Sequence, residues 1–133
     1  MARSLILSWP AGVSRFYWYS WDKLDMGLVQ PGSLELKPAA IAFDKVENLL
    51  TGGQLKRCTR DNKIWTCPLV RADGKRVWIV WTEDDMALNW SIPADWPVDL
   101  VETIDGKSFK PNGNSIQIGM APVFLFAQSN QAK

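Results

Sequence analysis

The spacing of aromatic residues near the start of the chain predicts an extended strand. Residues Gly12 to Asp22 are rich in aromatic side chains, which favour strands. Successive side chains of a strand point to opposite faces. This alternation would place Phe16 and Trp18 on one face, and Tyr17, Tyr19 and Trp21 on the other. Such a strand is either buried on both sides or presents one aromatic face to a ligand.

Two segments in the first half of the chain have apolar residues at helical spacing. Residues 2–9 are long enough for two helical turns, which the following proline would end. Residues 38–51 begin with a proline, carry a continuous apolar stripe and are followed by two glycines. Proline suits the first turn of a helix and glycine suits its end, so we predict a helix over 38–51. Residues 23–37 are predicted to form a long loop.

Beyond residue 54 the sequence changes to short apolar runs separated by turn residues, a pattern typical of antiparallel β-structure. The predicted strands cover 63–71, 76–82, 87–92, 98–103, 108–110, 115–118 and 123–127. A two-residue turn at Asp73-Gly74 would place Leu69 opposite Trp78. Both faces of this hairpin are apolar, so we expect its sheet to be covered on both sides.

These elements predict a mainly β fold, an antiparallel β-sandwich with one α-helix (38–51) packed on it. A chain of 133 residues is long enough for one domain with a hydrophobic core. We therefore expect a single domain over 1–133. Residues 1–53 would contribute the aromatic strand, loop and helix, 54–128 the sandwich, and 129–133 a frayed polar tail.

Composition excludes several classes of function. The 15 basic and 14 acidic residues give a net charge of +1 without a basic run, so no nucleic-acid partner is indicated. Histidine is absent, which excludes histidine-based catalysis and histidine metal ligands. We expect no metal and no cofactor. The first ten residues lack the features of a signal peptide, and no stretch is long enough to cross a bilayer, so no membrane association is expected.

The two cysteines flank another predicted turn, at residues 62–63. A hairpin folded there would place Cys58 directly opposite Cys67, and Arg60 opposite Trp65. The opposed thiols could form a disulfide, which is typical of exported proteins. Alternatively, they remain reduced and act as two small buried apolar side chains. Two thiols without further ligands do not make a zinc site.

Two stretches resemble the end of a clan-A glycoside hydrolase, a retaining (β/α)8 barrel related to families 5 and 39. Arg3 to Asp22, RSLILSWPAGVSRFYWYSWD, is similar to the seventh helix and eighth strand of such a barrel. Leu36 to Leu50, LKPAAIAFDKVENLL, is similar to its final helix. The remainder, with its Asp105-Gly106 turn and its closing Ala121 to Phe126, is similar to the small β-sandwich that often follows these barrels. The resemblance implies the C-terminal portion of such a hydrolase.

In the hydrolases that the chain resembles, the two catalytic carboxylates lie at the ends of strands four and seven, and both would precede Met1. The resemblance therefore implies that this chain alone is non-catalytic, a carbohydrate-associated accessory domain derived from a hydrolase and located outside the cell or in the periplasm. One alternative is a purely structural module or fragment that braces a hydrolase barrel. The other is a small glycoside hydrolase in its own right, which would use Asp22 and an acid from Glu83–Asp85.

The resemblance also indicates where a glycan would bind. In these barrels an aromatic residue at the end of strand eight forms the floor of a sugar subsite, because flat rings stack on the apolar faces of sugars. Trp21 is the first candidate for that role and Trp18 the second, with Tyr19 and Asp22 as neighbours. In the competing interpretation, Phe16 and Trp18 are core residues of the sandwich.

Further tryptophans fall into two groups. Trp90 and Trp96 flank a proline-rich turn and are expected to be exposed, as a pair that could bind a β-linked polysaccharide. Those in well-patterned strands are expected to be core residues: Trp65, Trp78 and Trp81. The expected partners are a glycan and either a hydrolase barrel or a second copy of the chain, because apolar faces without a barrel need another cover and could form a homodimer by strand exchange.

Overall fold

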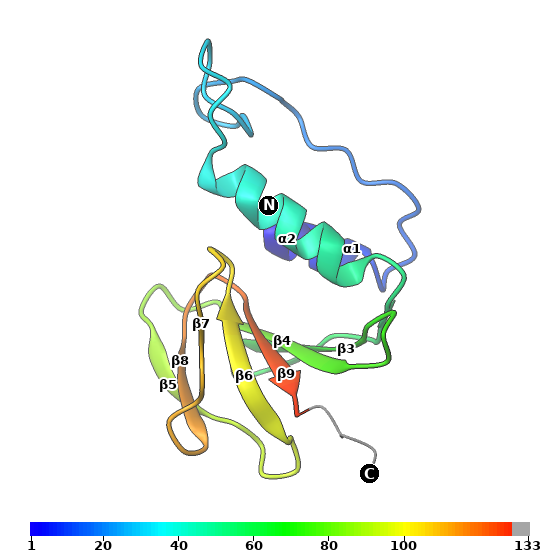
Figure 1. Cartoon of the computed structure of the whole chain (residues 1–133), viewed down its shortest axis with the longest axis vertical. Coiled ribbons are helices and arrows are strands. Elements are labelled where there is room, and N and C mark those ends of the chain that lie inside the picture. The colour runs from blue at the N-terminus through cyan, green and yellow to red at the C-terminus, as the bar shows by residue number, and fades with distance from the viewer. Residues whose placement is uncertain (129–133) are drawn as a thin grey trace.

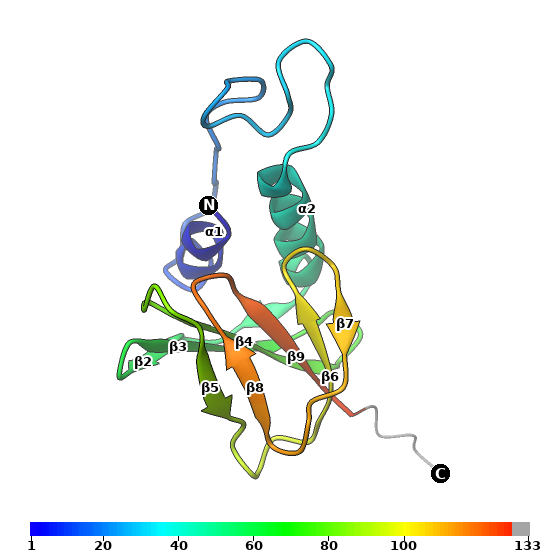
Figure 2. The same ribbon diagram turned by 90° about the vertical axis from the view of Figure 1, so that its left-hand side faces the viewer.

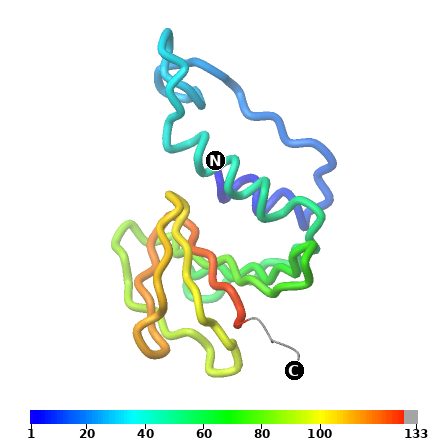
Figure 3. Tube along the Cα trace, in the orientation of Figure 1, coloured from blue at the N-terminus to red at the C-terminus, as the bar shows by residue number. Residues whose placement is uncertain are grey.

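The computed structural model describes residues 1–128, and the predicted tail at 129–133 lies outside them (Figures 1 and 3). The described chain contains two helices, α1 (Ala2–Ser8) and α2 (Pro38–Leu50). Its strands are β1 (Gln54–Leu55), β2 (Thr59–Asp61), β3 (Ile64–Val70), β4 (Arg76–Thr82), β5 (Leu88–Ser91), β6 (Val98–Thr103), β7 (Ser108–Phe109), β8 (Ser115–Ile118) and β9 (Val123–Ala127). The predicted mainly β fold with a helix at 38–51 is confirmed. None of the helices in the described residues is long and apolar enough to cross a membrane.

The strands form two antiparallel sheets of unequal size. The larger sheet has the order β1-β3-β4-β9-β6-β7, with β2 also paired to β3. The smaller sheet consists of β5 and β8. Both helices lie over one face of the larger sheet, whereas β5 and β8 lie on its other side (Figures 1 and 2). The expectation that the central hairpin is covered on both sides is therefore confirmed.

A separate apolar cluster fills each side of the larger sheet. On the helix side, residues of α1 and α2 pack onto strands β3, β4 and β9, and the buried members are Leu5, Ile6, Val46, Leu49, Leu50, Cys67, Leu69, Val77, Ile79, Trp81 and Phe124. On the other side, the two sheets enclose Trp78, Val80, Ile92, Val101, Ile116, Ile118, Val123, Leu125 and Ala127. Burial of each large apolar side chain contributes about 1.5–3 kcal/mol, so these clusters account for the association of helices and sheets.

Helix α2 is attached to the sheet by polar as well as apolar contacts. Its proline at the first helical position and the left-handed Gly52 beyond its end (φ +70°) define its limits. Within it, Lys45 Nζ lies 2.5 Å from Glu102 Oε2 on β6. This ion pair orients the helix along the sheet while its apolar stripe packs into the helix-side cluster.

The β3–β4 hairpin lies one residue out of the predicted register. Leu69 pairs with Val77 and not with Trp78. The loop contains three residues, 72–74, because the residues on either side of it are hydrogen-bonded to each other. Its last residue, Gly74, has φ +79°, which glycine adopts without strain. The shift of one position moves Trp78 to the face of β5 and β8.

The β2–β3 hairpin has the predicted register. Arg60 pairs with Trp65, and the two turn residues Asn62 and Lys63 both have positive φ, at 43° and 66°. A disulfide joins Cys58 to Cys67 at the base of this hairpin. Alternation along β2 and β3 therefore directs Arg60, Trp65 and the cysteines to the helix side of the sheet.

Candidate functional site

The aromatic segment is extended but belongs to neither sheet. Residues 13–21 follow α1 without forming strand pairs, so the predicted strand is wrong. All strands of the described residues come from 54–127, and the helices lie between that sheet and most of the segment (Figures 1 and 2). Aromatic residues favour an extended backbone, but a strand also requires a neighbour with which to exchange hydrogen bonds.

The side chains of this segment alternate between packed and exposed, with the period of two that the sequence predicts. Phe16 and Trp18 are half-buried: Phe16 packs against the helix-side cluster, and Trp18 Nε1 donates a hydrogen bond of 2.9 Å to the carbonyl of Met26. The other aromatic side chains are 81%, 70% and 60% exposed: Tyr17, Tyr19 and Trp21. We call these three residues the aromatic row. Their exposure leaves flat apolar surface in contact with solvent.

Backbone contacts hold the end of the aromatic row in place. The carbonyl of Trp21 accepts hydrogen bonds from the N–H groups of Leu28 (2.8 Å) and Val29 (3.0 Å). Val29 itself is buried. Beyond Trp21, the Lys37 ammonium donates to two carbonyls of the 23–26 turn at 2.7 and 2.8 Å. Trp21 is thus displayed on an anchored backbone, and the exposed Asp22 lies directly beside it in sequence.

Trp90 and Trp96 are half-buried, so the expectation that both are exposed is wrong. The ring of Trp96 stacks on Trp78 with centroids 4.5 Å apart and planes 10° apart. Trp90 is tilted against Trp96 at 5.9 Å and 60°. The reason is the hairpin register, because Trp78 faces β5 and β8 and gives Trp96 a ring to cover. Both rings therefore pack partly against the cluster between the sheets and keep part of their surface exposed.

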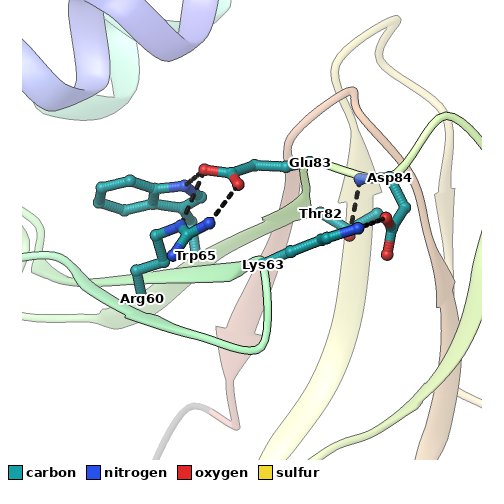
Figure 4. Close-up of polar contacts among 6 residues, drawn as sticks. All are labelled: Arg60, Lys63, Trp65, Thr82, Glu83 and Asp84. Carbon is teal, nitrogen blue, oxygen red and sulfur yellow. Dashed lines mark hydrogen bonds and ion pairs between the residues drawn. The ribbon is translucent and has the colours of Figure 1, made fainter.

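Two residues of the acidic segment after β4, Glu83 and Asp84, pair with basic residues of the β2–β3 hairpin (Figure 4). The Arg60 guanidinium donates to both oxygens of Glu83 at 2.9 and 2.6 Å, and Trp65 Nε1 donates to one of them at 2.7 Å. These hydrogen bonds, from Arg60 first and then Trp65, lower the pKa of Glu83 from 4.5 to about 2. Lys63 Nζ lies 2.7 Å from Asp84 Oδ1, and this contact raises the pKa of Lys63.

Such an arrangement does not favour Glu83 as a general acid. A general acid in glycoside hydrolysis requires a raised pKa so that it holds its proton at neutral pH, whereas the pKa of Glu83 is lowered. Among residues 1–128, no group of three His, Cys, Asp or Glu side chains could hold a metal ion. The run instead connects the β2–β3 hairpin to the end of β4.

Sequence reasoning named Trp21, Tyr19 and Asp22 for this site but not Tyr17 or Lys37. The alternation that groups Tyr17 with Tyr19 and Trp21 was a sufficient signal for Tyr17. No sequence signal indicates that Lys37 binds the carbonyls of the 23–26 turn, because that contact depends on how the loop folds.

Comparison with known proteins shows that this fold is similar to part of a larger enzyme. A family 39 glycoside hydrolase from the gut symbiont Bacteroides cellulosilyticus WH2 aligns with a TM-score of 0.72 and 17% identity, over 96% of this chain and 29% of that structure. At this identity the similarity shows a shared fold only. This chain thus spans less than a third of that structure's length.

A second structure, a candidate alpha-galactosidase from Bacteroides fragilis NCTC 9343, aligns over 58% of this chain and 19% of that chain. Its TM-score of 0.43 and identity of 14% are too low to support an argument. No family model matches the sequence. No curated protein is similar enough to count as a match.

Proposed function

We propose that this chain is a non-catalytic, carbohydrate-associated accessory domain derived from a glycoside hydrolase. It corresponds in this proposal to the C-terminal portion of such an enzyme, the last strand and helix of a (β/α)8 barrel followed by the β-sandwich. The fold shared with part of a family 39 glycoside hydrolase supports this assignment. The lowered pKa of Glu83 argues against Glu83 as the general acid of a hydrolase in its own right.

The observation that carries the proposal is the exposure of the aromatic row. Trp21 is 60% exposed and Tyr19 is 70% exposed, although isolated large aromatic side chains gain free energy from burial. Indole and phenol rings stack on the C–H faces of sugars, and the neighbouring Asp22 carboxylate could accept hydrogen bonds from hydroxyl groups. Trp21 is accordingly the platform of this proposal, with β-linked polysaccharide as its ligand.

Affinity electrophoresis tests this function. The protein is run through gels that contain soluble β-linked polysaccharides, and tryptophan fluorescence is titrated with the same glycans. We expect retardation and quenching for the wild type and for Trp9→Ala, and loss of retardation for Trp21→Ala. Trp9 is a matched control because it is also an exposed tryptophan, at the end of α1. A mobility that no polysaccharide alters, or that Trp21→Ala leaves unchanged, would reject the proposal.

A second candidate function is a structural module that braces a hydrolase barrel. The observation that favours it is the uneven distribution of exposed apolar residues: of the thirteen large ones within residues 1–128, ten lie between Trp9 and Ile41. Clustered apolar exposure is typical of a surface that another protein covers. Here the rest of a barrel, or a second copy of the chain, would cover it.

Size-exclusion chromatography with light scattering distinguishes the two candidates. A structural module predicts that the isolated chain self-associates, and that polar substitutions at Leu24 and Leu34, which are 80% and 66% exposed, restore the monomer. A glycan-binding module predicts a monomer that responds to polysaccharide. The disulfide supports a location outside the cell or in the periplasm within this proposal, because such bonds persist in oxidising compartments.

A further inference from the structure

A cleft of about 200 Å³ lies on the side of the larger sheet remote from the helices. It opens between the β2–β3 hairpin and strand β5 of the smaller sheet. Six residues line it: Thr59, Asp61, Asn62, Ile64, Thr66 and Trp90. The aromatic row is not among them, so this cleft is separate from the site described above.

Strand register explains why these side chains converge. Thr59 pairs with Thr66, and Asp61 pairs with Ile64. Side chains at alternate positions of a strand share one face, so all four lie on the face opposite Arg60, where Ile64 packs against the cluster between the sheets. The two threonine hydroxyls thus come from directly opposed positions of neighbouring strands.

The polar groups of this cleft are available to a ligand. Within residues 1–128, no side-chain hydrogen bond involves Thr59, Asp61, Asn62 or Thr66. No lysine or arginine of these residues lines the cleft. The hydroxyls and the amide can both donate and accept hydrogen bonds, and the carboxylate accepts them. This set matches a ligand with several hydroxyl groups and disfavours one with negative charge.

Trp90 supplies an apolar wall beside these polar groups. Its ring is held against Trp96, which itself stacks on the buried Trp78, so little side-chain freedom remains to be lost when a ligand binds. A pyranose ring has an apolar C–H face and a rim of hydroxyls, which is the combination that this cleft offers. Its volume is below the roughly 300–1,000 Å³ typical of pockets for drug-sized ligands, and therefore favours a single ring.

We propose that this cleft is a subsite for one neutral sugar residue, such as the end of a glycan chain. The sugar stacks on Trp90 and exchanges hydrogen bonds with Thr59, Thr66 and Asp61. The inference rests on the proposed carbohydrate association, but it uses a different surface and a different set of residues. Uronic acids are excluded by the Asp61 carboxylate and by the absence of a basic residue from the described lining.

NMR titration of the 15N-labelled chain tests the proposal. Neutral hexoses and short neutral oligosaccharides should shift the amides of 59–66 and the Trp90 indole, and glucuronic acid should not. The double variant Thr59→Val, Thr66→Val should bind at least tenfold more weakly, because it removes both hydroxyls and keeps the β-branched shape that strands favour. Thr51→Val, beyond the end of α2, should bind as the wild type does.

The aromatic row supplies the control that separates the two proposals. Trp21→Ala should lose retardation by polysaccharide yet keep the sugar-induced shifts at the cleft. Sugar-induced shifts without any polysaccharide retardation would reject the function of Trp21 and support the cleft. The cleft proposal is overturned if no neutral sugar shifts 59–66, if glucuronic acid binds equally well, or if the double valine variant, folded by its amide spectrum, retains full affinity.

Discussion

Trp65 Nε1 donates a hydrogen bond of 2.7 Å to Glu83 Oε1, and Arg60 binds both oxygens of the same carboxylate. The Trp65 ring also stacks on the buried Trp81, with centroids 5.7 Å apart. Glu83, the residue that follows β4, therefore accepts hydrogen bonds from both strands of the β2–β3 hairpin. The contact lies on the surface, but it orients a ring that packs against the helix-side cluster.

Stability should depend on pH through this carboxylate. The contacts with Arg60 and Trp65 lower the pKa of Glu83 from 4.5 to about 2 in the folded state. A lowered pKa stabilises the fold fully above the unfolded value, and this contribution is lost as the pH falls from about 4.5 towards 2. We expect Glu83→Gln to have a lower Tm than the wild type at neutral pH and a shallower decline in acid. Thermal unfolding followed by circular dichroism at a series of pH values measures both.

Part of the acid-induced decline in Tm should remain in Glu83→Gln. Asp105 also has a pKa lowered to about 2, by hydrogen bonds from Thr103 first and then Lys107. The variant Asp105→Asn should remove this second part. The exposed Asp95 provides a control substitution, Asp95→Asn, because it takes no part in the polar contacts of Glu83 or Asp105. Parallel Tm profiles for the wild type and Glu83→Gln would contradict the assignment.

Reduction of the disulfide should destabilise the chain. Cys58 and Cys67 are nine residues apart in sequence, and the closure of such a short loop is worth about 2–3 kcal/mol in the chain-entropy account. We expect the free energy of unfolding, measured in urea, to fall by that amount when a thiol reductant is added. The double variant Cys58→Ala, Cys67→Ala should be insensitive to the reductant. An equal response in both proteins would show that the effect does not come from this bond.

Much of the fold could be predicted because local patterns determine it. The apolar stripe and the terminal proline and glycine signals indicate α2, and the apolar runs bounded by turn residues indicate β3 and β4, all of which the structure contains. The register of the hairpin was not predictable in the same way, because Ala72-Asp73-Gly74 suits a loop of two or three residues. Only packing decides between them, and the one-residue difference moves Trp78 to the other face of the sheet.

The candidate site was less predictable for two physical reasons. Aromatic spacing indicates an extended backbone at 13–21, but whether that backbone joins a sheet depends on distant strands. The exposure of Trp90 and Trp96 depends on which face of the sheet Trp78 occupies. The predicted hairpin register assigned Trp78 to the wrong face. The cleft beside Trp90 is even less predictable from local sequence patterns, because residues of both sheets line it.

Two phenylalanines allow the core to be tested with matched substitutions. Phe124 on β9 is fully buried in the helix-side cluster, whereas Phe109 on β7 is 43% exposed. We expect Phe124→Ala to reduce the free energy of unfolding by about 3–5 kcal/mol, because it leaves a cavity beneath α2. Phe109→Ala should cost less than about 1 kcal/mol. Urea denaturation compares the two variants, and similar losses would contradict the position of the core.

Gly74 provides a test of the three-residue loop that sets the hairpin register. Its φ of +79° is costly for residues with a side chain, although an added Cβ would meet no atom within 4 Å. We therefore expect Gly74→Ala to lower the free energy of unfolding by about 1–2 kcal/mol from backbone strain alone. Gly119 has equal space around its Cβ position without a positive φ, so Gly119→Ala should be neutral or stabilise by up to about 1 kcal/mol. Gly74→Asn should recover part of the loss, because asparagine tolerates the left-handed region better than alanine does. If Gly74→Ala is as stable as Gly119→Ala, position 74 does not require a left-handed residue, which would contradict the loop geometry described here.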